Sequence, residues 1–421
     1  MIELPFGHSS LKISDVGAAV LRSRVQEISA SEDGGVLVRR AMEHPIASAR
    51  LSELAVGKKT CTVILSDHTR PVPSRDILPN MLRELREGNP QIAVTLLIAT
   101  GFHRLTTEAE LIRKLGEDIV RREKIVVHDS ADPASNVEIG ILPSGAPLVI
   151  DRAAAEAELL ISEGFIEPHF FAGFSGGRKS VLPGVAARET VLGNHCGAFI
   201  ASPNARTGIL DGNPIHKDMV AAARMAGLAY IVNVIIDEKK RTAAAFAGDP
   251  FAAHQAGVDF LRCYCEVKAK PSDIVVTTNG GAPLDQNLYQ CVKGLTAAEA
   301  AAKDGGVLIL VAECADGTGG DGFYQSLKNA ASAEELYRKA ESTPWDQTVP
   351  DQWESQILAR ILMRHTVIAV TKPELQTTVE EMKMQFAATV DEALARARGI
   401  KGEAASLTII PDGVSLIVRP V

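Results

Sequence analysis

Short, continuous runs of aliphatic and β-branched residues recur along this chain, and they constrain its fold more than any other feature. Such runs are typical of strands buried on both faces of a parallel sheet, because a strand with one solvated face alternates apolar and polar residues. The runs are "TCTVILSD", "IAVTLLIATG", "KIVVHDS", "AELLISEGFI", "YIVNVIID", "DIVVTTNGG", "GGVLILVAEC", "HTVIAVTK" and "SLTIIPDG".

Segments with a helical pattern lie between these runs. They are "PSRDILPNMLRELREG", "TTEAELIRKLGEDIVRRE" with its Thr-x-x-Glu-like opening, and "VEEMKMQFAATVDEALARARG". We expect the last to be one amphipathic helix that ends at Gly399. The alternation predicts the α/β fold class with mainly parallel sheets. The length of 421 residues suggests two domains, and a polar, Pro-containing link at 266–273 predicts α/β domains over 1–270 and 271–421.

Composition narrows the class of protein. The formal charge of −8 argues against a nucleic-acid surface, and no apolar segment approaches the ~18 residues that span a bilayer. The opening "MIELPFGHSS" lacks the basic start and apolar run of a signal peptide. The six cysteines form no CxxC pair, which indicates neither a zinc site nor a disulfide framework. We therefore expect a cytoplasmic protein that binds neither nucleic acid nor a membrane.

Polar clusters follow several of the expected strands, where ligands bind in α/β sheets. They are "SDHTRP", "ATGFHR" and "TTNGGAPLDQ". Arg70 in the first cluster suits the capture of a carboxylate or phosphate. Gln290 and Lys293 follow the third cluster and are three residues apart, which puts them on one face of a helix. An ordinary amphipathic surface helix would give the same spacing.

The segment 169–184, "HFFAGFSGGRKSVLPG", looks partly like a phosphate-binding loop. The phosphate-loop pattern requires glycine directly before the lysine, and Arg178 stands there. One interpretation is a flexible loop with a solvated Arg178–Lys179 pair. The other is that the glycines let the backbone approach a ligand and present Lys179 as a nucleophile for a cofactor. A lone histidine is usually structural, but His103, His169 and His195 together make a better case for a site around this lysine.

These pieces together resemble the lactate racemase family, whose members use a nickel-pincer nucleotide. The motifs "DHTRP", "GFHR", "HFFAGFSGGRKSVLPG…NH", "NGGAPLDQNLYQCVKG" and "DQWESQIL" carry the resemblance over nearly the whole chain. It implies an isomerase that racemises or epimerises a small, lactate-like 2-hydroxy carboxylate. It also implies cofactor-synthesis proteins as maturation partners and an active site in the cleft between the two domains.

The resemblance implies a role for each matching residue. Lys179 matches the lysine bonded to the cofactor, pyridinium-3-thioamide-5-thiocarboxylic acid mononucleotide with nickel, and His195 matches the nickel ligand. His103 and His169 match the acid/base pair. The residues that match substrate-pocket positions are Arg70, Gln290, Lys293 and Trp353, and those expected beside the cofactor are Asp67 and Arg70.

The expected chemistry explains why these residue types are needed. Removing the C2 hydrogen as a proton leaves a carbanion beside a carboxylate, whereas removing it as a hydride gives a planar 2-keto acid that can be reduced on either face. Each face then needs its own base for the hydroxyl proton, and histidine suits this because its pKa is ~6.5. The cofactor supplies the hydride chemistry, and nickel is compatible with imidazole and sulfur ligands.

Other functions remain open at the level of sequence. A nicotinamide-linked 2-hydroxy acid dehydrogenase is weakened because no G-x-G-x-x-G follows the first strand. A non-catalytic nickel or nucleotide carrier would not need both His103 and His169. Phe102 and Ala282 depart from the family pattern and are expected to reshape the pocket. Lactate, malate, aryl-lactates and sugar acids all fit, and the oligomeric state and cofactor content are not fixed.

Overall fold

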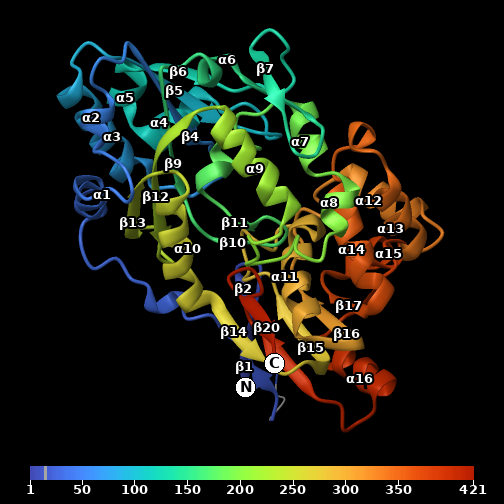
Figure 1. Ribbon diagram of the computed structural model, residues 1–421. Helices are drawn as coiled ribbons and strands as arrows, with labels where there is room; N and C mark the ends of the chain where they lie inside the picture. Colours follow the sequence, from blue (N-terminus) through green and yellow to red (C-terminus); the bar gives the residue numbers. More distant parts are fainter. Residues whose placement is uncertain (14–16) are drawn as a thin grey trace. The chain divides into compact units, whose positions relative to one another are not determined.

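The computed structural model describes residues 1–13 and 17–421, and these residues pack into two compact units (Figure 1). Each unit combines segments that are far apart in sequence: unit 1 consists of Met1–Arg24, His195–Gly208 and Cys265–Val421, and unit 2 of Val25–Asn194 and Ile209–Tyr264. The division into continuous domains over 1–270 and 271–421 stays a prediction.

Unit 2 is built on a six-stranded sheet with the order β13-β12-β9-β4-β5-β6. Neighbouring strands are parallel except β12 and β13. The strands are β4 (Thr60–Ser66), β5 (Ala93–Ala99), β6 (Lys124–Val127), β9 (Leu159–Phe165), β12 (Leu228–Ile236) and β13 (Thr242–Gly248). Two small hairpins are added: β7 (Asn136–Ile141) with β8 (Pro147–Asp151), and β10 (Pro168–His169) with β11 (Gly173–Phe174).

The helices of unit 2 connect these strands. The α-helices are α1 (Gly34–Glu43), α2 (Leu51–Leu54), α3 (Ser74–Gly88), α4 (Glu108–Leu115), α5 (Glu117–Arg122), α6 (Arg152–Ala155), α7 (Arg188–Asn194), α9 (Pro214–Met225) and α10 (Ala252–Cys265). Short 3-10 helices are η1 (Val25–Glu27) and η2 (Gly177–Ser180).

Unit 1 is built on an all-parallel six-stranded sheet with the order β18-β17-β16-β15-β19-β3. Its strands are β3 (Ala19–Val20), β15 (Ser272–Thr278), β16 (Ala302–Val311), β17 (Thr366–Val370), β18 (Gln385–Ala387) and β19 (Leu407–Ile410). Two smaller pairs are β1 (Ile2–Phe6) with β2 (Ser9–Ile13), and β14 (Glu266–Ala269) with β20 (Ile417–Pro420).

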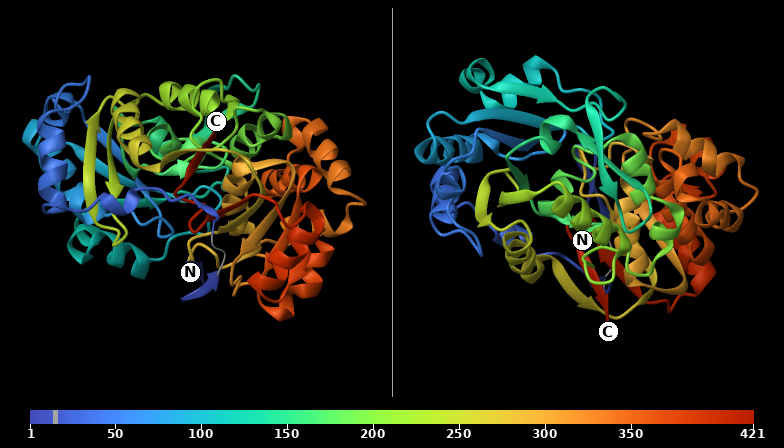
Figure 2. Two further views of the ribbon diagram at one scale, coloured as in Figure 1. Left: turned by 90° about the horizontal axis from the view of Figure 1, so that it is seen from below. Right: turned by 45° about the horizontal axis from the view of Figure 1, so that its top comes forward.

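The helices of unit 1 lie mostly in its C-terminal segment, coloured orange to red in Figures 1 and 2. The α-helices are α8 (Gly197–Ala201), α11 (Leu288–Ala301), α12 (Asp321–Asn329), α13 (Ala333–Ser342), α14 (Gln352–Arg364), α15 (Gln376–Glu381) and α16 (Val390–Lys401). Short 3-10 helices are η3 (Trp345–Gln347) and η4 (Pro373–Leu375).

The α/β class with mainly parallel sheets is confirmed, and each predicted strand run contains an observed strand. The reason is burial on both faces. In β16, consecutive residues from Gly306 to Val311 are all buried, so an alternating pattern would leave polar groups in the core. The Thr-x-x-Glu signal is also confirmed, since Thr107 and Glu110 form a capping box at the start of α4.

One expected helix is wrong. The segment 379–399 is not continuous, because the backbone turns at Lys383, which has a φ of 67°, and then forms strand β18. Phe386 and Ala387 of β18 pair with β17. Helix α16 then starts afresh with Thr389 as N-cap and ends at Lys401, beyond the predicted end at Gly399. The pairing of β18 with β17 outweighs the local helical pattern.

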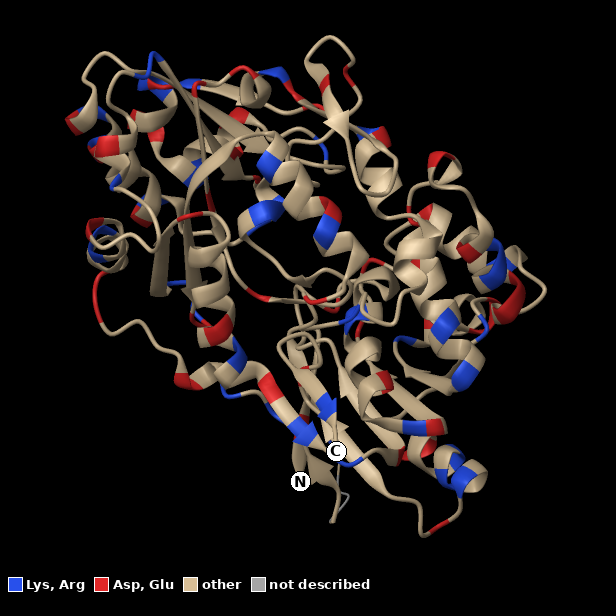
Figure 3. Ribbon diagram, in the orientation of Figure 1, with Lys and Arg blue, Asp and Glu red and all other residues tan. Residues whose placement is uncertain are grey.

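Charges of both signs are interspersed along the elements of both units (Figure 3). Several form i,i+4 pairs on helices, such as Arg121 with Glu117 and Arg152 with Glu156. Within the described part of the chain, no helix combines the length and the apolar character that crossing a membrane requires.

Candidate active site

Asp67 and His103 form a hydrogen-bonded pair at the carboxyl edge of the unit 2 sheet. Strands β4 and β5 are parallel neighbours, so the residues that follow them lie side by side. His103 Nδ1 is 2.7 Å from Asp67 Oδ2, and the Thr69 hydroxyl donates to Asp67 Oδ1 over 2.8 Å. An ionised Asp67 requires the proton of neutral His103 to be on Nδ1, which leaves Nε2 for proton exchange.

The Asp67 carboxyl is 1% exposed, and its environment favours the ionised form. Burial opposes ionisation, but the hydrogen bond and charge of His103, the Thr69 hydroxyl and the Arg70 charge together lower the pKa of Asp67. Asp67 and His103 belong to two of the polar clusters that follow expected strands, and the structure brings them together.

The backbone that carries Arg70 is held by a lysine from α4. Lys114 Nζ donates to the carbonyl oxygens of Arg70 and Val72 over 3.2 and 3.4 Å. Burial lowers the pKa of Lys114, and the charge of Arg70 adds to this effect, while Glu163 and Asp67 oppose it. The Arg70 guanidinium itself is exposed, with Nη1 3.4 Å from the Thr69 hydroxyl. This side chain is therefore available to bind an anion.

Arg178 is buried, so the interpretation of a solvated Arg178–Lys179 pair is wrong for the arginine. Its side chain is 1% exposed and donates to the carbonyl oxygens of Phe174 and Ala172, each over 2.8 Å. Its Nε donates to His216 Nδ1 over 3.0 Å. Burial lowers the pKa of Arg178 to about 9, and burial with the Arg178 charge lowers the pKa of His216 to about 3. Arg178 thus holds the loop from inside.

The glycines before Arg178 pack the loop against unit 2. Gly176 and Gly177 have φ values of 77° and 53°. A Cβ atom would lie 2.6 Å from Asn233 Oδ1 at Gly176 and 2.8 Å from His254 Cγ at Gly177. These two glycines therefore meet the protein interior, whereas the sequence predicts that they bring the backbone to a ligand. Their packing against Asn233 and His254 fixes the turn that leads to Lys179.

Lys179 and His169 lie together at the end of this turn. Lys179 Nζ is 3.4 Å from His169 Nε2, and the amide of Ala172 donates to His169 Nδ1 over 3.3 Å. The His169 ring stacks on Phe170 with centroids 5.2 Å apart, and Lys179 Nζ lies 5.8 Å from the centroid of Phe171. The His169 imidazole and the Lys179 amine thus lie side by side against the aromatic rings of Phe170 and Phe171.

In unit 1, Gln290 and Lys293 lie on one face of α11, as their spacing predicted. Asn287 caps the helix by accepting from the amide of Gln290 over 3.0 Å. Lys293 Nζ donates to Gln290 Oε1 over 2.6 Å. The amine and amide form one polar group on the first turns of the helix.

His195 and Trp353 also meet within unit 1. Their rings are 5.1 Å apart between centroids in an edge-on arrangement. The Trp353 Nε1 donates to the Tyr289 hydroxyl over 3.1 Å, which fixes the indole against α11. No sequence pattern singles out Glu354, the residue after Trp353. Glu354 is fully buried, and burial raises the pKa of its carboxyl to about 8.

The predicted site residues thus form two groups, each inside one unit: Asp67, Arg70, His103, His169 and Lys179 in unit 2, and His195, Gln290, Lys293 and Trp353 in unit 1. The predicted cleft between domains stays a prediction. Among the described residues, no cluster of three or more His, Cys, Asp or Glu side chains is arranged to hold a metal ion. Within each group, pairs of the predicted residues contact each other.

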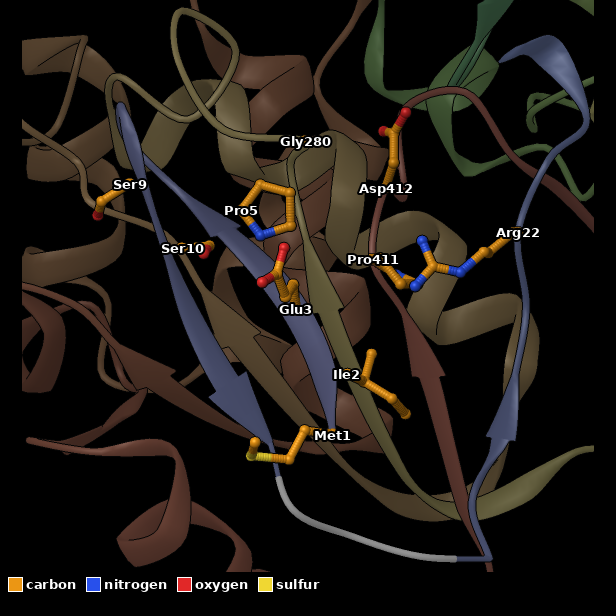
Figure 4. Close-up of a pocket in the computed structure, with 10 residues that line it drawn as sticks. All are labelled: Met1, Ile2, Glu3, Pro5, Ser9, Ser10, Arg22, Gly280, Pro411 and Asp412. Atoms are coloured by element: carbon orange, nitrogen blue, oxygen red, sulfur yellow. The ribbon is translucent and has the colours of Figure 1, made fainter. Parts of the chain in front are cut away.

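A separate cavity of about 590 Å³ lies in unit 1 (Figure 4). Gly280 comes from one of the polar strand-end clusters, and Arg22 and Asp412 follow the neighbouring strands β3 and β19. The lining contains none of the predicted site residues. It consists of Met1, Ile2, Glu3, Pro5, Ser9, Ser10, Arg22, Gly280, Pro411 and Asp412.

Comparison with known proteins gives consistent matches along the chain. Residues 6–208 match the family model "Lactate racemase N-terminal domain", and residues 267–418 match "Lactate racemase C-terminal domain". The lactate racemase of Thermoanaerobacterium thermosaccharolyticum is 51% identical over 421 residues, covering 99% of each chain. That of Lactiplantibacillus plantarum is 53% identical over 382 residues, covering 91% of this chain and 90% of the relative.

Solved structures agree. The lactate racemase apoprotein from T. thermosaccharolyticum superposes with a TM-score of 0.95 at 51% identity over 99% of both chains. A Thermotoga maritima protein shares the fold with a TM-score of 0.65 at 18% identity, over 92% of this chain and 98% of that one.

Proposed function

Because the chain belongs to the lactate racemase family and is therefore an isomerase of the racemase class, we propose that it inverts C2 of a 2-hydroxy carboxylate, with lactate as the first candidate. The observation that carries this proposal is the 2.7 Å contact between His103 Nδ1 and Asp67 Oδ2. It gives one histidine a fixed orientation and a defined tautomer, which a proton-transfer group requires.

The two histidines would serve opposite faces of the substrate. His103 would exchange the hydroxyl proton through Nε2, because its Nδ1 is engaged by Asp67. His169, which lies beside Lys179, would serve the other face. Arg70 and Lys293 would hold the substrate carboxylate, since both are cations on turns or helix starts that are fixed by neighbouring groups. The carbon would pass through a planar 2-keto acid.

The side chains fit the nickel-pincer nucleotide that the resemblance implies. Lys179 supplies a primary amine on a turn that Arg178 fixes from within, and His195 supplies an imidazole beside Trp353. Lys179 and His195 would hold this group, and when bound it would supply hydride chemistry at C2. Proteins that make the cofactor would be needed for maturation. The chain itself would bind the substrate, orient it and move the hydroxyl proton.

The test is a panel of enantiopure 2-hydroxy acids with cofactor-loaded protein. The panel contains lactate, malate, an aryl-lactate and a sugar acid, and loss of optical rotation is followed for each. We expect at least one to racemise or epimerise without added nicotinamide. A metal-loaded protein that racemises none of them would support a carrier, and net oxidation that depends on added nicotinamide would support a dehydrogenase.

A further inference from the structure

Two buried polar residues, Thr100 and His128, join the ends of neighbouring strands in unit 2. Thr100 follows β5 and His128 follows β6, and they are 2% and 0% exposed. The His128 amide donates to the carbonyl oxygen of Ile98 over 3.1 Å, and the Thr100 hydroxyl donates to the carbonyl oxygen of His128 over 2.5 Å. The two residues therefore form a hydrogen-bonded pair at the carboxyl edge of the sheet, where Asp67 and His103 also meet.

The His128 ring reaches two further acceptors, which come from different segments. Its Nδ1 is 3.1 Å from Oδ2 of Asp151, the N-cap of α6, and its Nε2 is 3.1 Å from the carbonyl oxygen of Ala186, which lies between η2 and α7. Since both ring nitrogens face acceptors, the ring and the Asp151 carboxyl together must hold two hydrogens, one on Nε2 and one between Nδ1 and Oδ2. The ring thus connects the end of β6 to the start of α6 and to the segment between η2 and α7.

Both ends of this arrangement lead to predicted site residues. At one end, the carbonyl oxygen of Thr100 accepts from the amide of His103 over 2.8 Å. At the other end, the Gly184 amide donates to the carbonyl oxygen of Lys179 over 3.2 Å, and the Gly184 carbonyl oxygen accepts from the amide of Gly101 over 3.0 Å. The Gly101–Gly184 bond therefore joins the loop of His103 to the turn of Lys179, and the buried pair anchors the backbone next to both of its ends.

Another buried threonine of unit 2 shows what the same kind of bond does away from the site. Thr242 is 1% exposed, and its hydroxyl donates to Asp76 Oδ2 over 2.7 Å, which ties β13 to α3. No predicted site residue lies on either of these elements. The Thr100 hydroxyl makes its bond three residues before His103, the residue proposed for proton transfer, so its position calls for more than a structural explanation.

We propose that Thr100 and His128 are positioning residues, which fix the loop of His103 and the turn of Lys179 relative to each other. This inference rests on the proposed function, because that function assigns proton transfer to His103 and the cofactor bond to Lys179. Reacting groups must be held close to their productive positions, and a displacement of about 1 Å can lower a rate roughly 10²-fold. The Thr100 hydroxyl sets the position of the loop, and the Nε2 of His128 sets that of the turn through Ala186.

The first test is amide hydrogen exchange in the cofactor-free chain, measured by mass spectrometry on a peptide that covers residues 176–188. An asparagine side chain places its donor near the position of Nδ1, and a glutamine side chain places its donor near that of Nε2. His128→Asn should therefore lose the bond to Ala186 and speed exchange in this peptide roughly 5- to 100-fold, whereas His128→Gln should speed it less. Exchange at the wild-type rate in His128→Asn would overturn the inference.

The second test compares kcat and KM of cofactor-loaded wild type and Thr100→Val, which removes the hydroxyl and leaves the His128 ring in place. We expect kcat to fall roughly 10- to 100-fold with KM changed little, because the loop of His103 loses its anchor. Thr100→Ser keeps the hydroxyl and should have a kcat near that of wild type. Thr242→Val is the matched control and should lower the unfolding temperature without lowering kcat. A wild-type kcat in Thr100→Val, or an equal loss of kcat in Thr242→Val, would overturn the inference.

These outcomes separate the inference from the proposed function. Failure of the wild type to racemise any 2-hydroxy acid would overturn the proposed function, and the exchange test would still decide whether His128 holds the turn of Lys179. The two tests also rest on different residues, so either one decides the inference if a variant used in the other fails to fold.

Discussion

Each unit presents one lysine and one buried carboxyl at its group of site residues, and the two carboxyls behave in opposite ways. Asp67 in unit 2 and Glu354 in unit 1 are 1% and 0% exposed. Asp67 accepts hydrogen bonds on both oxygens, and its pKa is lowered. Glu354 accepts none from the described residues, and its pKa is raised to about 8. Equal burial therefore gives opposite protonation, because partners decide the outcome.

The contrast indicates which group of site residues has its hydrogen bonds in place before any ligand binds. The Asp67 group already has its hydrogen bonds, so it can orient His103 in the ligand-free chain. The Glu354 carboxyl accepts no hydrogen bond from the described residues, and burial raises its pKa.

The largest expected difference is between the two lysines. Lys179→Ala should remove the covalent cofactor adduct completely, because the amine that bonds to the cofactor is gone. Lys293→Ala should retain the adduct and raise KM. Intact-protein mass spectrometry of both variants, matured alongside wild type, measures the adduct directly. An adduct of equal yield on Lys179→Ala would refute the assignment of this lysine.

The next largest effect concerns the two histidines of unit 2. His103→Ala or His169→Ala alone should lower racemisation by roughly 10²–10⁴-fold, the usual contribution of general acid–base catalysis. The double variant should be little worse than the worse single variant, because inversion needs both faces. Trapping the keto acid from each enantiomer should show opposite preferences in the two single variants. Near-wild-type racemisation by either would rule out the two-face model.

A smaller effect is expected for Asp67→Asn, which tests the complete hydrogen-bond network. Hydrogen bonds to charged groups contribute about 1.5–3 kcal/mol, so kcat/KM should fall roughly 10- to 150-fold. The amide introduced by this substitution cannot hold His103 in one tautomer, whereas the covalent adduct at Lys179 should be unaffected. An unchanged kcat/KM would mean that Asp67 does not position His103.

The smallest expected effects are on the stability of the folded chain, and they test the comparison between Asp67 and Glu354. The Asp67 pKa is lowered on folding, so its contribution is fully present above its ordinary value of 3.8 and is lost as pH falls through the folded pKa. The Glu354 pKa is raised from 4.5 to about 8, so the folded state binds the extra proton and wild type loses stability as pH rises between these values.

Unfolding temperatures measured from acid to alkaline pH should therefore separate the two variants. Asp67→Asn should differ from wild type least at the most acidic pH. The unfolding temperature of Glu354→Gln should rise relative to that of wild type from about pH 4.5 to pH 8, and the difference should then stay constant. Parallel curves for the two variants would contradict the contrast between the two carboxyls.

Sequence alone predicted much of this arrangement where the physics is local or set by strand order. Asp67 and His103 follow adjacent parallel strands, so their contact was foreseeable. Gln290 and Lys293 are one helical turn apart, and their contact follows from that spacing. The depth of Arg178 was not foreseeable, because its partner His216 lies on α9, far along the chain. The protonation state of Glu354 depends on which hydrogen-bond donors do not reach its carboxyl, and no sequence pattern predicts that.

The buried Arg178 makes the order of two adjacent residues matter. Exchanging Arg178 and Lys179 would leave composition and net charge unchanged, so any measure that counts residues would not detect the swap. Inside the loop, however, a lysine amine would have to replace a planar guanidinium that donates to carbonyl oxygens and an imidazole in several directions. At the tip, a guanidinium would replace the primary amine, and a guanidinium stays protonated and is no nucleophile. The role of this dipeptide therefore depends on the order of its two residues along the chain.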